Sequence, residues 1–214
     1  MAFRSRVVAF EELDSQQAKW IGLKKIHWQD PTGKDRLWEA AERKTRGSSG
    51  VDAVAIFAII RSKKETFKPS TVIIEQYRPP IDKVIIEVMY SPELPAGLVD
   101  DGETVEAAAI RELEEETGFK ADRVIETSSL LATDPGMTTA NMKLSMLSVS
   151  MEDDLQTYDQ KLDAGEFIVK RVVELDNLHA ELEEYSKKGC VVDARLHHIA
   201  VGYALAARLK TGSI

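Results

Sequence analysis

Three glutamates in one short segment of the chain could act together on a cation. Glu112, Glu115 and Glu116 lie within Val105–Thr117, a segment of helical composition. At about 100° per residue, Glu112 and Glu116 fall within about 40° of each other on a helix, with Glu115 beside them. The adjoining face is apolar and carries Ala109, Ile110 and Leu113. The spacing therefore predicts three carboxylates that converge next to a hydrophobic core.

Like charges at these spacings repel by about 0.2–0.5 kcal/mol per pair, and only Arg111 offers local compensation. A bound cation would remove that conflict. Carboxylate ligands, without suitable cysteine or histidine nearby, favour Mg²⁺ or Mn²⁺ over zinc. A run of glutamates is more commonly a solvated helix face, so the choice between these interpretations depends on the surrounding residues.

The surrounding spacing favours the metal interpretation. The chain fills every fixed position of the pattern G-x5-E-x7-R-E-U-x-E-E-x-G-U, where U is a bulky apolar residue. The matching residues are Gly97, Glu103, Arg111, Glu112, Leu113, Glu115, Glu116, Gly118 and Phe119. The segment 97–119 resembles the Nudix box, and nine fixed positions make it far more specific than a short glycine motif.

The resemblance implies a loop, a helix and a second loop that hold divalent ions against a diphosphate. Glu112 and Glu116 would be the principal metal ligands, with Glu115 as a further ligand or catalytic group. The carbonyl of Ala96 would join the metal shell, and Arg111 would orient the carboxylates. Mg²⁺ is the expected cofactor, with Mn²⁺ as a substitute.

The flanking segments resemble the eukaryotic ADP-ribose pyrophosphatases, also called ADP-sugar diphosphatases. The similarity extends from about Lys19 to about Leu205. It rests on Leu37–Glu39 with Arg43, Gln76–Pro80, Leu94–Gly97, Asp134–Met137 and Gly165–Phe167. The substrate expected from this resemblance is ADP-ribose or another ADP-sugar, cut to AMP and a sugar phosphate. An oxidised nucleotide, a dinucleotide polyphosphate and a non-catalytic ADP-ribose-binding module are the alternatives; NADH is disfavoured because the four cysteines of a zinc module are lacking.

The resemblance also implies substrate-binding residues and a homodimer. Trp20 and Trp38 match aromatics that sandwich the adenine, one from each subunit, a task that needs only a flat π-face. The other implied substrate contacts are Glu39, Arg43, Arg78, Leu98 and Asp134. Each has an ordinary alternative: the tryptophans suit a core or an interface, the arginines suit surface ion pairs, and Asp134 suits a Pro-Gly turn.

Glu166 matches the loop carboxylate that such enzymes use as general base and as a metal partner. A carboxylate beside a divalent ion can accept the proton of an attacking water. The motif Gly165-Glu166-Phe167 is weak by itself, and Glu115 is the alternative base.

One departure from the family pattern precedes the box. About six residues are inserted between Pro80 and Leu94. Either Glu87 or Glu93 could therefore fill the acidic position before the box, and an extended loop there would narrow the site.

The elements expected to position these residues indicate an α/β fold. Lys19–Trp28 and Leu37–Arg43 predict an N-terminal hairpin. The remaining predicted strands are Val51–Ile60, Thr71–Tyr77, Val84–Val88, Val124–Leu131, Met142–Ser150 and Phe167–Val173, and the helices are Val105–Thr117, Leu178–Lys188 and Ala194–Leu209. We expect a Nudix α/β/α sandwich with a mixed sheet in residues 49–214. Residues 1–48 would form a small N-terminal β domain for dimerisation and adenine binding.

Composition excludes several partners. The formal charge of −8 disfavours nucleic acid and anionic membranes, and no apolar run is long enough to cross a bilayer. We expect a cytoplasmic protein, with a nuclear or mitochondrial pool left open. Cys190 is expected to be a small buried hydrophobe, and His197-His198 to be structural, because no acidic partner stands at a ligand spacing.

Overall fold

A computed structural model describes residues 5–81 and 90–213 of the chain. Its elements are β1 (Ile21–Gln29), β2 (Asp35–Arg43), β3 (Ala53–Ser62), β4 (Ser70–Gln76), η1 (Pro79–Ile81), β5 (Ser91–Glu93), β6 (Ala96–Leu98), α1 (Val105–Thr117), β7 (Arg123–Thr127), β8 (Leu131–Ala132), β9 (Asn141–Met151), β10 (Ile168–Glu174), η2 (Leu175–Asn177), α2 (Leu178–Lys187) and α3 (Ala194–Thr211). The predicted strand Val84–Val88 and Glu87 lie outside the described residues.

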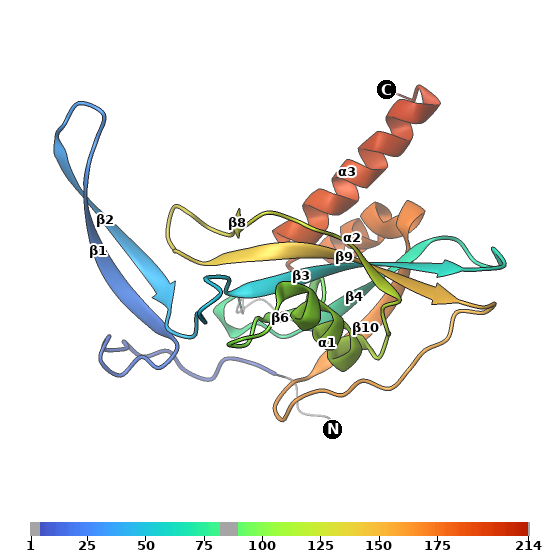
Figure 1. Cartoon of the computed structure of the whole chain (residues 1–214), viewed down its shortest axis with the longest axis horizontal. Helices are drawn as coiled ribbons and strands as arrows, with labels where there is room; N and C mark the ends of the chain where they lie inside the picture. The colour runs from blue at the N-terminus through green and yellow to red at the C-terminus, as the bar shows by residue number, and fades with distance from the viewer. Residues whose placement is uncertain (1–4, 82–89, 214) are drawn as a thin grey trace.

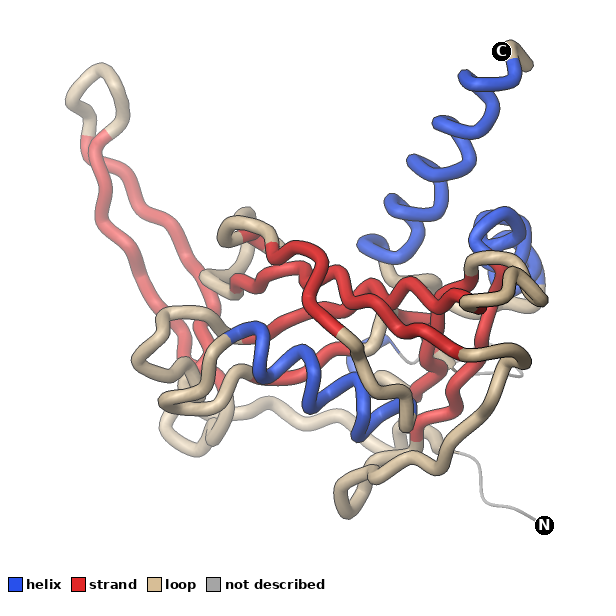
Figure 2. Tube along the Cα trace, turned by 45° about the vertical axis from the view of Figure 1, so that its right-hand side comes forward, coloured by secondary structure: helices blue, strands red, loops and turns tan. Residues whose placement is uncertain are grey.

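The central sheet is mixed, as the sequence predicts. Its main strand order is β10-β4-β3-β9-β7, with β5 beside β4, β6 beside β3 and β8 beside β9. Strands β3 and β9 run parallel, whereas β10, β5 and β6 pair antiparallel with their neighbours. Figure 2 shows the sheet between α1 on one side and α2 with α3 on the other. This arrangement is the expected α/β/α sandwich.

Alternation along β3 explains why both faces of the sheet are covered. Val54, Ile56, Ala58 and Ile60 join the core under α1, which also contains Ala109 and Leu113. The intervening Ala55 and Phe57 face the second core, with Leu178, Leu182 and Leu196 of the two C-terminal helices. A strand that is buried on both faces has a nearly continuous apolar sequence, and Val51–Ile60 is such a sequence.

The hairpin β1–β2 is a separate two-stranded sheet that extends away from the body of the protein (Figure 1). It contacts the body at Ala41, whose amide donates to the Met137 carbonyl (2.9 Å) and whose carbonyl accepts from Thr139 (2.9 Å). The hairpin therefore adds a strand-like contact to the loop that contains Asp134.

The sequence was wrong about one continuous strand at 124–131. Strand β7 ends at Thr127 and β8 begins at Leu131. The ladder shifts register between Val124 and Glu126, and the Ser128 hydroxyl then accepts the hydrogen bond of the Leu144 amide (3.0 Å). A side chain thus replaces a backbone acceptor and interrupts the strand. Within the described ranges, no helix is long and apolar enough to cross a membrane.

Candidate active site

The acidic helix begins and ends where the sequence predicts. The Thr104 side chain accepts the Ala107 amide at the N-terminus of α1, and Gly118 adopts a left-handed φ of 74° at its C-terminus. A side chain at Gly118 would meet the Asp159 carbonyl at 2.5 Å. Two constraints therefore require glycine at position 118: its left-handed backbone angle and the close approach of the loop that contains Asp159.

Strand β6 lies directly against the carboxylates of α1. A Cβ atom at Gly97 would fall 1.8 Å from Oε1 of Glu112, so only glycine leaves room for that carboxylate. The Ala96 amide donates to Oε2 of Glu116 at 2.9 Å. In an extended strand the amide and carbonyl of one residue share an edge, so the Ala96 carbonyl also faces this side.

Glu116 is the most deeply placed of the acids, with 4% of its surface exposed. Burial, together with the charges of Glu112 and Glu166, raises the pKa of Glu116 to about 8. Burial also raises the pKa of Glu112, although the Arg111 guanidinium opposes that rise. Two carboxyls whose charged forms are disfavoured lie side by side, which is the electrostatic situation that a bound cation relieves.

Arg111 organises the outer part of the cluster. Its guanidinium donates to Glu112 (2.7 Å), to Glu115 (3.0 Å) and, through two bonds of 3.0 and 2.9 Å, to Glu103. A further bond of 3.1 Å reaches the Leu98 carbonyl of β6. Since these acids surround it, the pKa of Arg111 is raised and the side chain stays charged. The predicted orienting role fits this geometry.

The loop before β10 brings Glu166 to the acidic helix. Gln160 donates to the Glu116 carbonyl (2.5 Å), and the Lys161 amide donates to the Glu115 carbonyl (2.8 Å). Lys161 also forms an ion pair of 2.6 Å with Glu114. Anchored in this way, the loop places Glu166 near enough for its charge to raise the pKa of both Glu112 and Glu116.

The residues present suit a hard divalent cation. The carboxylates of Glu112 and Glu116 both lie against β6, the first beside Gly97 and the second at the Ala96 amide. Glu115 shares the Arg111 guanidinium with Glu112, and the charge of Glu166 acts on both Glu112 and Glu116. All the donors are oxygen atoms, which is the ligand set that Mg²⁺ and Mn²⁺ prefer.

Arg78 and Glu93 form an ion pair beside this site. Nε and Nη2 of Arg78 donate to the two carboxylate oxygens of Glu93 at 3.0 and 2.8 Å. Glu93 lies at the end of β5, paired with Ile74 of β4, and is buried. Glu116 also raises the pKa of Arg78, so the guanidinium lies near the acidic helix. Of the two acids considered for the position before the box, Glu93 is the one that the described structure places here.

The predicted adenine-binding residues lie on the projecting hairpin and its contact loop. Trp38 is 47% exposed, and its indole nitrogen donates to the Gly136 carbonyl at 3.1 Å, beside Asp134. Trp20 is 68% exposed at the base of the hairpin. Arg43 ends β2, and Glu39 precedes Ala40 on the same strand. The fold thus joins Trp38 to the Asp134 loop, while the hairpin itself points away from α1 (Figure 1).

Sequence reasoning missed an ion pair that holds this region together. Arg46, which lies between β2 and β3, donates to both oxygens of the buried Asp52 carboxylate at 2.8 Å. Arg46 also reaches the Thr139 carbonyl (2.6 Å), and Asp52 accepts the Asn141 amide (3.0 Å). The sequence did not indicate this ion pair, because an arginine and an aspartate six residues apart form no recognisable motif. Their further partners come from residues 139–141, far away in the chain.

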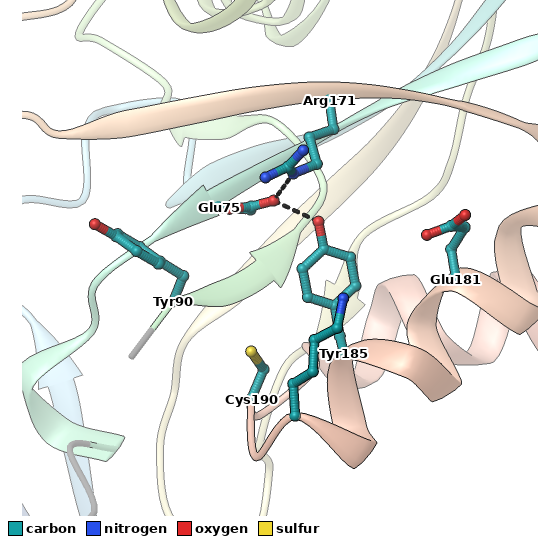
Figure 3. A pocket seen from close by; sticks show the side chains of 7 residues that line it. Glu75, Tyr90, Arg171, Glu181, Tyr185 and Cys190 are labelled. Carbon is teal, nitrogen blue, oxygen red and sulfur yellow. Dashed lines mark hydrogen bonds and ion pairs between the residues drawn. The ribbon is translucent and has the colours of Figure 1, made fainter. Parts of the chain in front are cut away.

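A second missed cluster lines a cavity of about 270 Å³ on the α2 side of the sheet. Figure 3 shows Arg171 and Tyr185 converging on the buried carboxylate of Glu75, to which both donate hydrogen bonds. Burial raises the pKa of Tyr185 and of Cys190 at its edge. Glu75, Arg171 and Tyr185 satisfy one another's polar groups, and none of the residues predicted to be functional lines this cavity.

Comparison with known proteins agrees with the site. The NUDIX domain model matches residues 50–193. An uncharacterized Nudix hydrolase from Schizosaccharomyces pombe is 43% identical over 200 residues, 93% of each chain. The chain belongs to the Nudix hydrolase family.

Other relatives carry more specific names. The ADP-ribose pyrophosphatase of Saccharomyces cerevisiae is 38% identical over 90% of this chain and 80% of its own. The ADP-sugar pyrophosphatase of Mus musculus is 33% identical over 93% of this chain and 87% of its own. A solved structure described as an ADP compounds hydrolase superposes with a TM-score of 0.60 at 18% identity, covering 99% of this chain and 100% of that one. At that identity, the superposition supports the fold alone.

Proposed function

We propose that the protein hydrolyses the diphosphate of ADP-sugars, chiefly ADP-ribose to AMP and ribose 5-phosphate. The observation that carries the proposal is the contact between Gly97 and Glu112, where absence of a side chain leaves room for the carboxylate beside buried Glu116. This contact supports an intact catalytic box. The names of the yeast and mouse relatives support ADP-ribose or another ADP-sugar as substrate.

Mg²⁺ is the proposed cofactor, with Mn²⁺ as a substitute. Glu112, Glu116 and the Ala96 carbonyl would hold the ion, and Glu115 and Glu166 would contact it directly or through water. When bound, a divalent ion neutralises charge on the diphosphate and makes a bound water more acidic. Its charge would also offset the repulsion between the Glu112 carboxylate and that of the buried Glu116.

Glu166 is the proposed general base. Its loop is held to α1 by Gln160 and Lys161, and its charge raises the pKa of both Glu112 and Glu116, which supports a position near the acid cluster. From there it can accept the proton of the attacking water. Arg111 keeps Glu112 and Glu115 oriented through its bonds of 2.7 and 3.0 Å. Arg78, with Leu98, is proposed to contact the substrate near the diphosphate.

We propose further that residues 1–48 serve dimerisation and adenine binding. Apolar side chains on the hairpin have much of their surface exposed, including Leu23 (71%), Leu37 (59%) and Trp28 (40%). Exposed apolar area of this kind favours contact with a second copy of the chain. Trp20 from one subunit and Trp38 from the other would then enclose the adenine, with Glu39, Arg43 and Asp134 at its edge.

A substrate panel tests the proposed activity. ADP-ribose, another ADP-sugar, a dinucleotide polyphosphate, NADH and an oxidised nucleoside diphosphate are each incubated with Mg²⁺ and analysed by chromatography. We expect AMP to form fastest from ADP-ribose, and Glu112→Gln to serve as the inactive control. Faster cleavage of a substrate other than an ADP-sugar would refute the specificity. Tight binding of ADP-ribose without cleavage would instead identify a binding module.

Light scattering tests the dimer. We expect twice the 23.9 kDa chain mass, and we expect Leu23→Asp to shift the protein toward the monomer because a charge would enter an apolar interface. The matched control is Lys34→Asp, an exposed substitution in the turn between β1 and β2. A monomer that hydrolyses ADP-ribose efficiently would contradict a site shared between subunits.

A further inference from the structure

Two histidines and a glutamate from different helices meet on the side of the sheet opposite α1. His179 and Glu183 lie one turn apart on α2, and His197 lies in the first turns of α3. Nε2 of His179 is 3.9 Å from Oε1 of Glu183, and Nε2 of His197 is 3.5 Å from the same oxygen. One nitrogen or oxygen atom from each residue lies within 4.8 Å of the others.

The backbone beneath these residues is well anchored. The neighbours Leu178, Leu182 and Leu196 are completely buried in one core cluster. Each of them adjoins a member of the triad, so packing fixes the rotation of both helices. The α3 N-terminus is fixed as well, because the Asp193 side chain accepts two amides of its first turn. The core therefore fixes the helix positions from which the three side chains extend toward one another.

The donor set differs from that of the acidic helix. Two imidazole nitrogens and one carboxylate form the ligand set of many zinc sites, in which a water completes a tetrahedron. Zinc bonds of about 2.0–2.2 Å place neighbouring ligand atoms about 3.4 Å apart. The observed distances of 3.5 and 3.9 Å are close to that value, so small side-chain rotations would complete the shell.

Glu183 is also suited to this role by its other contacts. Across residues 5–81 and 90–213, its ion-pair contacts are those with His179 and His197. The neighbouring Glu184 pairs with Lys187 at 2.6 Å. The Glu183 carboxylate therefore contacts the two imidazoles, whereas the Glu184 carboxylate contacts a lysine.

We propose that His179, Glu183 and His197 bind a transition-metal ion, Zn²⁺ in particular, which links α2 to α3. The ion would use three protein ligands and water. It would join two helices that already pack together and so stabilise the C-terminal part of the fold. In the sequence, no acidic partner stands at a ligand spacing from His197-His198, which predicts a structural role for the pair. The partner comes from another helix instead.

Zinc binding to the full chain tests this inference. The titration is made by calorimetry with Mg²⁺ in large excess, so that the acidic helix is occupied. We expect one Zn²⁺ per chain and a higher melting temperature when zinc is present. His197→Gln and His179→Gln should each lower zinc affinity at least about tenfold. Loss of a residue that only hydrogen-bonds a metal ligand already costs about that much affinity, so loss of the ligand itself should cost no less.

His198→Gln is the matched control, since His198 is the exposed neighbour of His197 and lies outside the triad. It should keep both the zinc affinity and the zinc-induced rise in melting temperature. Glu183→Gln provides a further ligand variant on an exposed position, and circular dichroism verifies that each variant is folded. Failure of the parent protein to bind zinc would overturn the inference. So would equal losses in the variants of His197 and His198, or unchanged binding in all ligand variants.

Discussion

Alanine at position 97 would place a methyl group where the Glu112 carboxylate lies. The new Cβ would be 1.8 Å from Oε1 of Glu112, whereas ordinary contact begins at 3.4 Å. The oxygen must therefore move by about 1.6 Å, a distance that also breaks its 2.7 Å bond from Arg111. Because misplacement of a reacting group by about 1 Å can cost about 100-fold in rate, we expect turnover to fall by at least that factor.

The fold should tolerate the same substitution. Gly97 is not among the glycines with positive φ, and the atom in the way belongs to the end of a flexible side chain. We therefore expect a melting temperature in the absence of metal that is close to the parental value. Mg²⁺ affinity should fall, because the displaced carboxylate is a proposed ligand.

The assay combines steady-state hydrolysis of ADP-ribose, calorimetric Mg²⁺ titration and thermal unfolding. Gly202→Ala is the control, since a Cβ there meets nothing within 4 Å and the site lies inside α3. It should leave turnover unchanged and stabilise the helix by up to about 1 kcal/mol. Near-parental turnover and Mg²⁺ affinity in Gly97→Ala would show that Glu112 does not act from its observed position. Loss of activity only through unfolding would also refute the reasoning.

Four further predictions concern the charges of the site. Glu112→Gln and Glu116→Gln should each lower turnover by orders of magnitude with unchanged circular dichroism, and near-parental rates at saturating Mg²⁺ would contradict the metal assignment. Because the pKa of Glu116 is raised to about 8, Mg²⁺ must displace a proton below that pH, so calorimetry should show affinity rising from about pH 6 to about pH 9. By the same linkage the metal-free protein should lose stability as pH rises from the ordinary carboxyl pKa through about 8, since the folded state then gives up a proton that it binds more tightly than the unfolded state does. Glu116→Gln is the control and should show a smaller loss of stability over the same pH range. Glu166→Gln should lower kcat about 10²–10⁴-fold with little change in KM and should remove the acid limb of the pH profile, whereas a modest loss with an unchanged limb would assign the base role to Glu115.

The cytoplasmic location expected from the sequence stays a prediction, because the fold does not test it. The domain boundary at residues 48 and 49 is likewise a proposal. The separate pairing of β1 with β2 is consistent with that boundary, although Arg46 ties the segment after the hairpin to Asp52 and Thr139 of the larger unit.

Local sequence was sufficient to predict the acidic helix with its carboxylates on one side. Helical periodicity depends on residues three and four apart, and the ends are marked by Thr104 and Gly118 within the same segment. The apolar run Val51–Ile60 likewise predicted a buried strand. Each of these features depends on residues that lie close together in the chain, so the sequence alone is enough to predict it.

The tertiary structure decided which distant groups meet. The charge of Glu166 acts on Glu116 because Gln160 holds the loop that contains Glu166 against α1. Arg78 pairs with Glu93 because β5 pairs with β4. His197 meets Glu183 only because buried leucines press α3 against α2. Such contacts depend on strand pairing and helix packing, which are set by burial across the whole core. They therefore cannot be predicted from the spacing of residues along the chain.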